Sequence, residues 1–354
     1  MELNNLFLVI LFVGFGLLFG KYFLLIIKKA DLRMLADDQF KKPQAFHENL
    51  TYRLGGAIYF SLLILVFLFL YFAKNFLSLE YILFCTFFFI LGLADDLKVN
   101  IAPKLRLILM TLFLIVLVLF NDTHIKKTGL DFLDNLIAID IFALIFICLC
   151  FLFIVNGSNL IDGFNGLLCI HSLIIFTTLF LINLYFNDTN LTYFLFCIIL
   201  LNLILLKFNF PKAQMFLGDS GAYLIGALIA VSVIKISNLN PSISPFFFCI
   251  LLFYLFFEVF FSFFRKIFVA KQSPLLPDNH HLHMSLYKLL LKRNSKKVKA
   301  NYTTSIYINI IYLILISPGI IFMQNGLFCR YYFFFLIFIY IFFYKFLYEK
   351  QSKP

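Results

Sequence analysis

Apolar runs of about 20 residues, separated by short polar stretches, follow one another along the whole chain. A helical run of this length crosses the hydrocarbon core of a bilayer. The pattern predicts eleven membrane spans, near 6–27, 54–73, 79–94, 105–120, 137–155, 166–186, 191–206, 220–237, 245–265, 305–323 and 328–348. The predicted fold class is an all-α polytopic membrane protein, a bundle of ten or eleven transmembrane helices that forms one domain over residues 1–354.

Composition agrees with this pattern. The chain is 63% hydrophobic and only 13% charged, with a mean hydropathy of +0.98, which excludes a water-soluble globular domain. The first run lacks a basic leading region and a small-residue cleavage site, so we expect a retained helix and not a signal peptide. The seven cysteines lie in or beside apolar runs without metal or disulfide spacing, and we interpret them as apolar side chains.

The basic residues are distributed unevenly between the two sides of the predicted bundle. With the N-terminus outside, 23 of the 29 Lys and Arg residues fall in the inner segments. Cytoplasmic loops carry such an excess, so the pattern predicts a periplasmic N-terminus. The net charge of +11 therefore reflects membrane orientation, and we expect no nucleic-acid partner.

Polar residues between the spans gather on this inner side. Their clusters are Lys41-Lys42-Pro43 through His47 to Arg53-Leu54-Gly55-Gly56; Asp95-Asp96-Leu97-Lys98; Asn156 to Leu167; Asn209; Phe216 to Gly221; and Asp278 to His283. Carboxylate and Asn oxygens beside Gly-rich turns suit an Mg²⁺ ion that bridges phosphate oxygens. Lys, Arg and His supply the opposite charge for a diphosphate. Phosphoryl transfer requires mainly positioning and charge neutralisation, so the inventory favours that reaction at the membrane surface.

Each cluster also has a structural interpretation. The Asp95-Asp96 pair can cap the helix predicted from residue 105, although the end of the preceding helix disfavours acids. The 156–167 segment can be a simple turn, and Asp219 can be a plain helix N-cap.

The histidine cluster and an acidic residue in the ninth span leave similar alternatives. His280, His281 and His283 can lie in a solvated loop or bind zinc, although no cysteine accompanies them. Glu258 lies inside a predicted span, where an ionisable residue is a functional candidate, or it can form a buried pair with Arg265.

Five motifs in order, all on one side, resemble the polyprenyl-phosphate N-acetylhexosamine-1-phosphate transferase family (glycosyltransferase family 4), which holds the WecA-like and MraY enzymes. The resemblance runs from about residue 40 to 285. The motifs are Arg-x-Gly-Gly (Arg53, Gly55, Gly56), the Asp95-Asp96 pair, Asn-x-x-Asn-x-x-Asp-Gly-x-x-Gly-Leu (156–167), Phe-x-Gly-Asp-x-Gly (216–221) and His-x-His (281–283).

The resemblance implies transfer of an N-acetylhexosamine 1-phosphate from a UDP-sugar to undecaprenyl (polyprenyl) phosphate, with release of UMP. It implies dependence on Mg²⁺, with Mn²⁺ as a substitute, and a multi-pass protein of the bacterial inner membrane whose site is cytoplasmic. The reaction would start a lipid-linked surface glycan such as O-antigen or capsule. Segment 265–304 would be a cytoplasmic substrate-recognition loop, and analogy implies a homodimer.

The resemblance also assigns roles to individual residues. It implies a catalytic set of Asp95, Asp96, Asp162, Asp219, His281 and His283. It implies metal ligation by Asp219 and Asn159. It implies substrate binding by Lys42, Arg53, Asn156, Gly163, Asn165, Asn209 and Phe216.

Four departures distinguish this chain from the family pattern. Asn165 replaces the second Asp of the Asp-Gly-x-Asp-Gly loop, and Leu255 stands where many relatives have Pro. Met284 stands where WecA-like enzymes often have another His. The three adjacent histidines of MraY are missing, which argues against a muramyl-pentapeptide substrate. The alternative functions are the MraY reaction, a non-enzymatic carrier of lipid-linked sugars and a membrane scaffold. A carrier usually has paired broken helices with polar residues at mid-depth.

Overall fold

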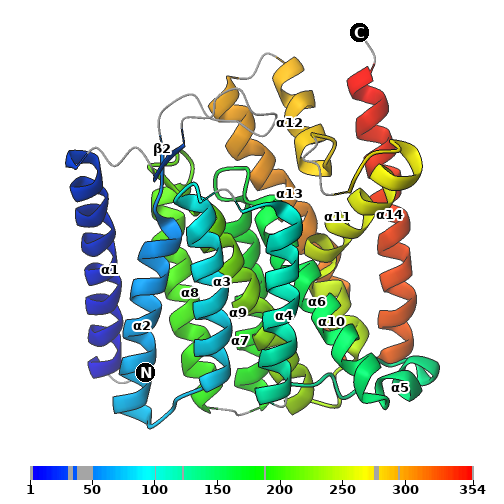
Figure 1. The fold of residues 1–354 in the computed structure, drawn as a ribbon, viewed down its shortest axis with the longest axis horizontal. Coiled ribbons are helices and arrows are strands. Elements are labelled where there is room, and N and C mark those ends of the chain that lie inside the picture. The colour runs from blue at the N-terminus through cyan, green and yellow to red at the C-terminus, as the bar shows by residue number, and fades with distance from the viewer. Residues whose placement is uncertain are drawn as a thin grey trace.

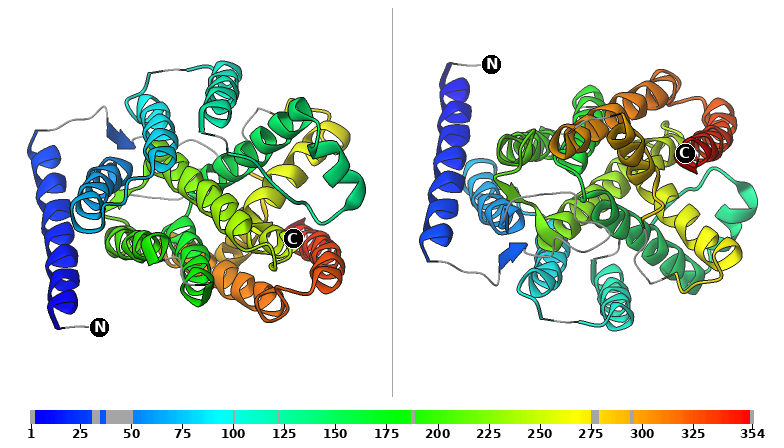
Figure 2. Two further views of the ribbon diagram at one scale, coloured as in Figure 1. Left: turned by 90° about the horizontal axis from the view of Figure 1, so that it is seen from below. Right: turned by 90° about the horizontal axis from the view of Figure 1, so that it is seen from above.

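The computed structural model describes residues 3–30, 35–37, 51–99, 101–121, 123–186, 189–274, 279–293 and 296–352. These residues form a bundle of long helices that lie side by side along one direction, with a small sheet at one end (Figure 1 and Figure 2). The helices are α1 (Leu3–Lys29), α2 (Gly55–Lys74), α3 (Leu79–Asp96), α4 (Pro103–Asn121), α5 (Asp131–Ile137), α6 (Asp140–Ile161), α7 (Leu167–Phe186), α8 (Thr189–Asn209), α9 (Gly218–Leu239), α10 (Pro245–Leu251), α11 (Phe253–Phe264), the π-helix Arg265–Val269, α12 (Leu282–Lys292), α13 (Lys297–Ile321) and α14 (Gly326–Ser352).

The predicted all-α membrane fold is confirmed. Among the described residues, nine helices are long and apolar enough to cross a membrane, and the bent pair α10–α11 makes a tenth. The remaining predicted span, 79–94, is α3, whose 18 residues include three carboxylates. It lies within the bundle against α9 and α2. We therefore treat α3 as a membrane helix whose acidic residues lie near its ends.

Helix α9 forms the centre of the bundle and packs against α3, α6, α2 and α7. Seventeen of its 22 residues are buried, and many of these are Gly, Ala or Ser. Small side chains let neighbouring helices approach closely where lipid provides no hydrophobic driving force. The N-terminus of α9 is thus fixed by neighbours on several sides.

The ninth predicted span, 245–265, is not straight. It breaks at Leu252, and the axes on either side differ by 75°. A broken helix exposes backbone groups that must find partners inside a membrane. The Tyr312 hydroxyl supplies one, because it donates to the Leu251 carbonyl at 2.5 Å. The nearest proline, Pro245, begins α10, so no proline lies at the break itself.

A small three-stranded sheet, which the sequence pattern did not predict, lies at one end of the bundle beside α2. Its order is β1 (Ala36–Asp37), β2 (Thr51–Arg53) and β3 (Met215–Phe216), with β1–β2 antiparallel and β2–β3 parallel. Arg53 pairs with Phe216 in this register. The sheet consequently joins the residues before α2 to those before α9.

The polar motifs meet at this same end. Helices α3, α6 and α11 end there, and α2, α7 and α9 begin there, beside β2 and α12 (Figure 1). The start of α1 and the end of α14 lie at opposite ends of the bundle (Figure 1). An odd number of membrane crossings requires this arrangement. The predicted loop 156–166 is shorter than expected, because α6 continues to Ile161. Much of segment 265–304 is helical, in the π-helix, α12 and the start of α13.

Candidate active site

Asp96 joins the last turn of α3 to the first turn of α9. Its carboxylate is 1% exposed and accepts the backbone N–H groups of Asp219 (2.9 Å) and Ser220 (3.0 Å). The Ser220 hydroxyl also donates to it, at 2.6 Å. Backbone N–H groups at a helix N-terminus lack intrahelical partners and favour negative charge. Asp96 therefore caps α9, and not the helix that follows it in sequence.

The glycine of the Phe-x-Gly-Asp motif makes this contact possible. Gly218 has φ +74°, a left-handed conformation that side chains disfavour, and a Cβ atom there would collide with Asp96 Oδ2. The Gly56 N–H also donates to the Leu217 carbonyl at 2.8 Å. The Arg-x-Gly-Gly, Asp-Asp and Phe-x-Gly-Asp motifs thus form one packed unit.

Asp95 belongs to a second polar chain beside the first. Its Oδ2 accepts a 2.5 Å hydrogen bond from Arg106 Nη1 on α4. The Arg106 guanidinium lies 5.8 Å from the ring centroid of Tyr223, within cation–π range. The Tyr223 hydroxyl in turn accepts a hydrogen bond from Asn159 Nδ2 at 3.2 Å. This chain connects the Asp pair to the predicted metal neighbour Asn159.

Sequence reasoning missed Arg106 and Tyr223 as site residues. Arg106 had a usable signal, because it is a cation at the inner start of a span shortly after the acidic pair. Tyr223, one turn after Asp219, had no signal that separated it from other tyrosines in apolar runs. In the structure, Arg106 and Tyr223 together connect Asp95 to Asn159.

Asp162 completes a group of neighbouring carboxyl groups. It directly follows α6, and burial together with the negative charges of Asp219 and Asp96 raises its pKa well above the usual value. Arg53 opposes this effect, and its Nη1 lies 3.7 Å from Asp96 Oδ1. The structure therefore gathers Asp162, Asp219 and Asp96 near Arg53, the last residue of β2.

The turn after Asp162 is fixed by amide side chains. The Asn165 backbone N–H donates to Asn301 Oδ1 at 2.8 Å, and its side-chain Nδ2 donates to the Pro211 carbonyl at 3.0 Å. Asn209 accepts the Gly166 N–H at 2.6 Å and donates to the Met215 carbonyl at 3.1 Å. An Asp at 165 could not donate to Pro211, which accounts for Asn at this departure from the family pattern.

The other predicted substrate-binding residues occupy different settings. Asn156 lies one turn before Asn159 on α6 and donates to the Leu152 carbonyl at 2.7 Å. Gly163 is exposed in the turn between α6 and α7, and Phe216 is half-buried in β3. Lys42 lies outside the described residues.

His281 directly precedes α12 and His283 lies in its first turn, and both are buried, at 3% and 0% exposed. The His283 ring packs edge-on against Phe164, with 5.5 Å between centroids. Because Phe164 is in the turn after Asp162, this contact brings the histidine segment to the carboxylate group. The histidines therefore lie in a packed setting and not in a solvated loop.

The side chains near Asp219 limit the kind of metal site that can form. Within the described residues, no group of three or more His, Cys, Asp or Glu side chains converges on a point that could hold a metal ion. A closed zinc site needs about four such ligands, and the described histidines do not provide it. Mg²⁺ differs, because it keeps several waters and uses one or two carboxylates plus substrate phosphates. The adjacent, mutually repelling carboxylates fit that open kind of site.

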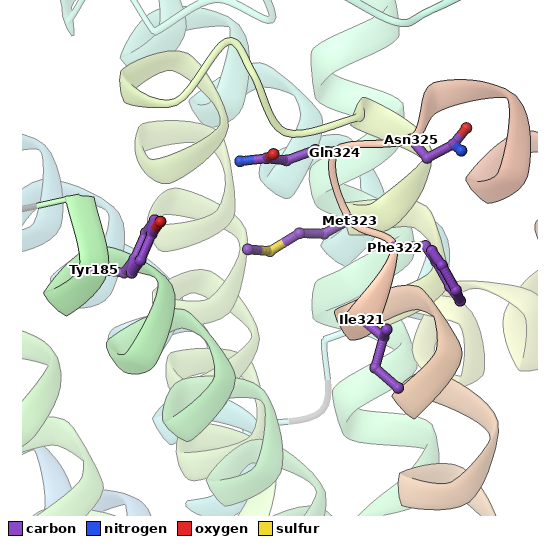
Figure 3. A pocket seen from close by; sticks show the side chains of 6 residues that line it. All are labelled: Tyr185, Ile321, Phe322, Met323, Gln324 and Asn325. Carbon is purple, nitrogen blue, oxygen red and sulfur yellow. The ribbon is translucent and has the colours of Figure 1, made fainter.

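The opposite end of the bundle has a shallow hollow of about 360 Å³ between the end of α7 and the α13–α14 turn. In Figure 3 the side chains of Tyr185, Met323 and Gln324 point toward this space. Its lining contains no charged side chain, so it offers no counter-charge for a phosphate. The polar group near β2 is the better candidate for chemistry.

Comparison with known proteins agrees with the motifs. A sequence model described as glycosyl transferase family 4 matches residues 78–237. The Phospho-N-acetylmuramoyl-pentapeptide-transferases of Dictyoglomus thermophilum and Dictyoglomus turgidum are 30% and 32% identical to the chain, and each alignment covers 69% of the chain and 78% of the relative. The chain belongs to glycosyl transferase family 4. The family predicted from the five motifs is thereby confirmed.

A second kind of family 4 relative also matches. The Undecaprenyl-phosphate alpha-N-acetylglucosaminyl 1-phosphate transferase of Thermotoga maritima is 29% identical over 192 residues. That alignment covers 54% of this chain and 54% of the relative, so the chain spans about half the length of this relative. The family 4 match at 78–237 includes Asp96, Asp162 and Asp219, whereas Arg53, His281 and His283 lie outside it.

Proposed function

We propose that this family 4 chain transfers an N-acetylhexosamine 1-phosphate from a UDP-sugar to a polyprenyl phosphate, at the cytoplasmic face of a bacterial inner membrane. The observation that carries the proposal is the meeting of Asp95, Asp96, Asp162 and Asp219 with Arg53 and Arg106 at one end of a membrane bundle. A site at the end of the spans can receive a soluble nucleotide from one side and a lipid phosphate from the bilayer.

The proposed reaction exchanges one phosphoanhydride for another. An oxygen of the lipid phosphate attacks the β-phosphorus of the UDP-sugar, the bond between that phosphorus and the bridging oxygen breaks, and UMP leaves with the bridging oxygen. A phosphate monoester has a second pKa near 6, so at pH 7 most of the acceptor is already a dianion. The enzyme then needs positioning and charge neutralisation more than a strong base.

The residues divide this work between them. Asp219 and Asn159 would hold Mg²⁺, which when bound neutralises diphosphate charge. Arg53 and Arg106 offer further positive charge at the same end. Asp96 already accepts three hydrogen bonds from α9 and is buried, so it positions Asp219. This engagement favours direct attack by the lipid phosphate over a two-step route with Asp96 as nucleophile.

The muramoyl-pentapeptide transfer reaction is the second candidate. It is supported by the two Dictyoglomus relatives, which carry that name and align over more of the chain than the Thermotoga relative does. Against it stands Leu282 between His281 and His283, because the resemblance implies three adjacent histidines for MraY. The two candidates share acceptor, metal and leaving group, and differ only in the donor sugar.

An assay of UMP release tests the proposal. The detergent-purified protein is mixed with undecaprenyl phosphate, Mg²⁺ and, in separate reactions, UDP-GlcNAc, UDP-GalNAc or UDP-MurNAc-pentapeptide. We expect UMP with an N-acetylhexosamine donor, dependent on the lipid and abolished by EDTA or by Asp219→Asn. UMP from the pentapeptide donor alone would select the second candidate. No UMP from any donor would overturn both.

The direct route has its own test. Incubation with labelled donor but without lipid acceptor should leave no sugar phosphate or phosphate on the protein. A covalent adduct trapped on an Asp side chain would overturn direct attack in favour of the two-step route.

A further inference from the structure

Glu258 is a buried carboxylate at which three distant segments meet. It lies on α11, is 1% exposed, and accepts hydrogen bonds on both oxygens. Oε1 accepts from His281 Nδ1 at 3.1 Å and from the Leu282 backbone N–H at 3.0 Å. Oε2 accepts from the Tyr340 hydroxyl at 2.5 Å. Helix α14 is thereby connected through Glu258 to the first residues of α12.

These contacts determine which nitrogen of His281 carries a proton. A carboxylate accepts hydrogen bonds, so Nδ1 of His281 is the donor, and in the neutral ring Nε2 is the unprotonated nitrogen. A carboxylate behind a functional histidine fixes both the tautomer and the ring orientation.

The neighbouring histidine is fixed from the same helix. His283 Nδ1 lies 3.1 Å from the hydroxyl of Tyr254, one turn before Glu258 on α11. The rings of His281 and His283 are nearly parallel, at 5° with centroids 5.5 Å apart. The start of α12 is therefore held against α11 by two contacts, Glu258–His281 and Tyr254–His283. Tyr340 of α14 binds the Glu258 of the first contact.

We propose that Glu258 and Tyr340 are positioning residues, through which α14 fixes the tautomer and orientation of His281 for the transfer reaction. This inference rests on the proposed function, but its structural half can be tested without any substrate. It gives the last span a role in catalysis, although that span lies outside the residues matched by the family model.

The kinetic test uses Tyr340→Phe, which removes one hydroxyl and keeps the ring. We expect kcat for UMP release to fall about 10–100-fold, the range for loss of a group that orients an active-site ligand, with KM for the donor changed less than about twofold. Tyr332→Phe is the matched control, because its hydroxyl lies on the same helix and donates to the Leu315 carbonyl at 2.7 Å. It should lose a similar hydrogen bond and keep kcat.

The substrate-free test measures histidine modification by diethyl pyrocarbonate, site by site, with mass spectrometry. His281 should react several-fold faster in Tyr340→Phe and in Glu258→Gln than in the wild type or Tyr332→Phe. The exposed His124, at the opposite end, provides the internal reference. Thermal unfolding of each variant in detergent identifies any that is misfolded.

The two readouts keep the inference and the proposed function apart. If the wild type releases no UMP, the proposed function fails, and the modification rates alone decide whether α14 holds His281. Unchanged modification of His281 in Tyr340→Phe, or an equal loss of kcat in Tyr332→Phe, would overturn the inference.

Discussion

Asp96 accepts the backbone N–H of Asp219 across the α3–α9 contact, with 2.9 Å between nitrogen and oxygen. Asp96 ends its own helix, where the helix dipole disfavours a negative charge. It also faces the N-terminus of α9, where the dipole favours one. Two motifs that are 123 residues apart therefore depend on each other, since Asp96 caps the first turn of α9, which carries Asp219.

Asp96→Asn should cost both stability and activity. An amide replaces one acceptor oxygen with a donor and leaves a buried N–H or O–H group of α9 without a partner. Such a loss costs about 2–4 kcal/mol in the free energy of unfolding. Thermal unfolding in detergent and UMP release should both fall. Asp95→Asn, which breaks a partly exposed pair with Arg106, should lower the unfolding temperature less.

Asp219→Asn should separate activity from stability. Asp219 adds negative charge beside Asp162 and Asp96, so its neutralisation relieves repulsion in the absence of Mg²⁺. We expect an unfolding temperature equal to or above that of the wild type, and UMP release reduced at least about 1,000-fold because the proposed metal ligand is lost. Added Mg²⁺ should raise the unfolding temperature of the wild type more than that of this variant. Activity within tenfold of the wild type would contradict the proposed role.

The fold class and most spans could be predicted from the sequence because bilayer thickness imposes a length that apolar runs reveal directly. The bend at Leu252 could not. It is stabilised by the Tyr312 hydroxyl from α13, a contact between residues 61 apart with no local signature. The β1–β3 sheet was missed for a similar reason, because its strands have only two or three residues and pair across long stretches of chain.

The site residues could be named from the sequence, but not their partners. The motifs pointed to Asp95, Asp96, Asp162 and Asp219, and the structure gathers them at one end of the bundle. The partner expected for Glu258 was Arg265, seven residues along the same helix. Glu258 instead binds His281, Leu282 and Tyr340, while Arg265 donates to Ser262 at 3.4 Å. Side-chain spacing along one helix says little about contacts made between helices.

Gly92→Ala should disturb the packing of α3 against the first turn of α9. A Cβ atom at Gly92 on α3 would lie 2.5 Å from the backbone carbonyl carbon of Asp219. Helix α3 would have to move away from α9, at a cost of about 1–3 kcal/mol for overpacking. We expect lower stability and at least tenfold slower UMP release. Gly14→Ala on α1 is the control, because a Cβ atom there meets nothing within 4 Å and both measurements should stay unchanged.

Arg106→Gln tests whether the second polar chain contributes to the reaction. The variant keeps a polar side chain but removes the charge that pairs with Asp95 and lies over Tyr223. If Arg106 neutralises diphosphate charge, the loss should appear mainly in kcat, about 100–1,000-fold for removal of one group from a transition-state contact. Lys104→Gln removes an exposed charge of the same sign from the same helix and should alter kcat less than twofold. Equal effects of both substitutions would show that overall positive charge, and not the Arg106–Asp95 contact, accounts for the dependence.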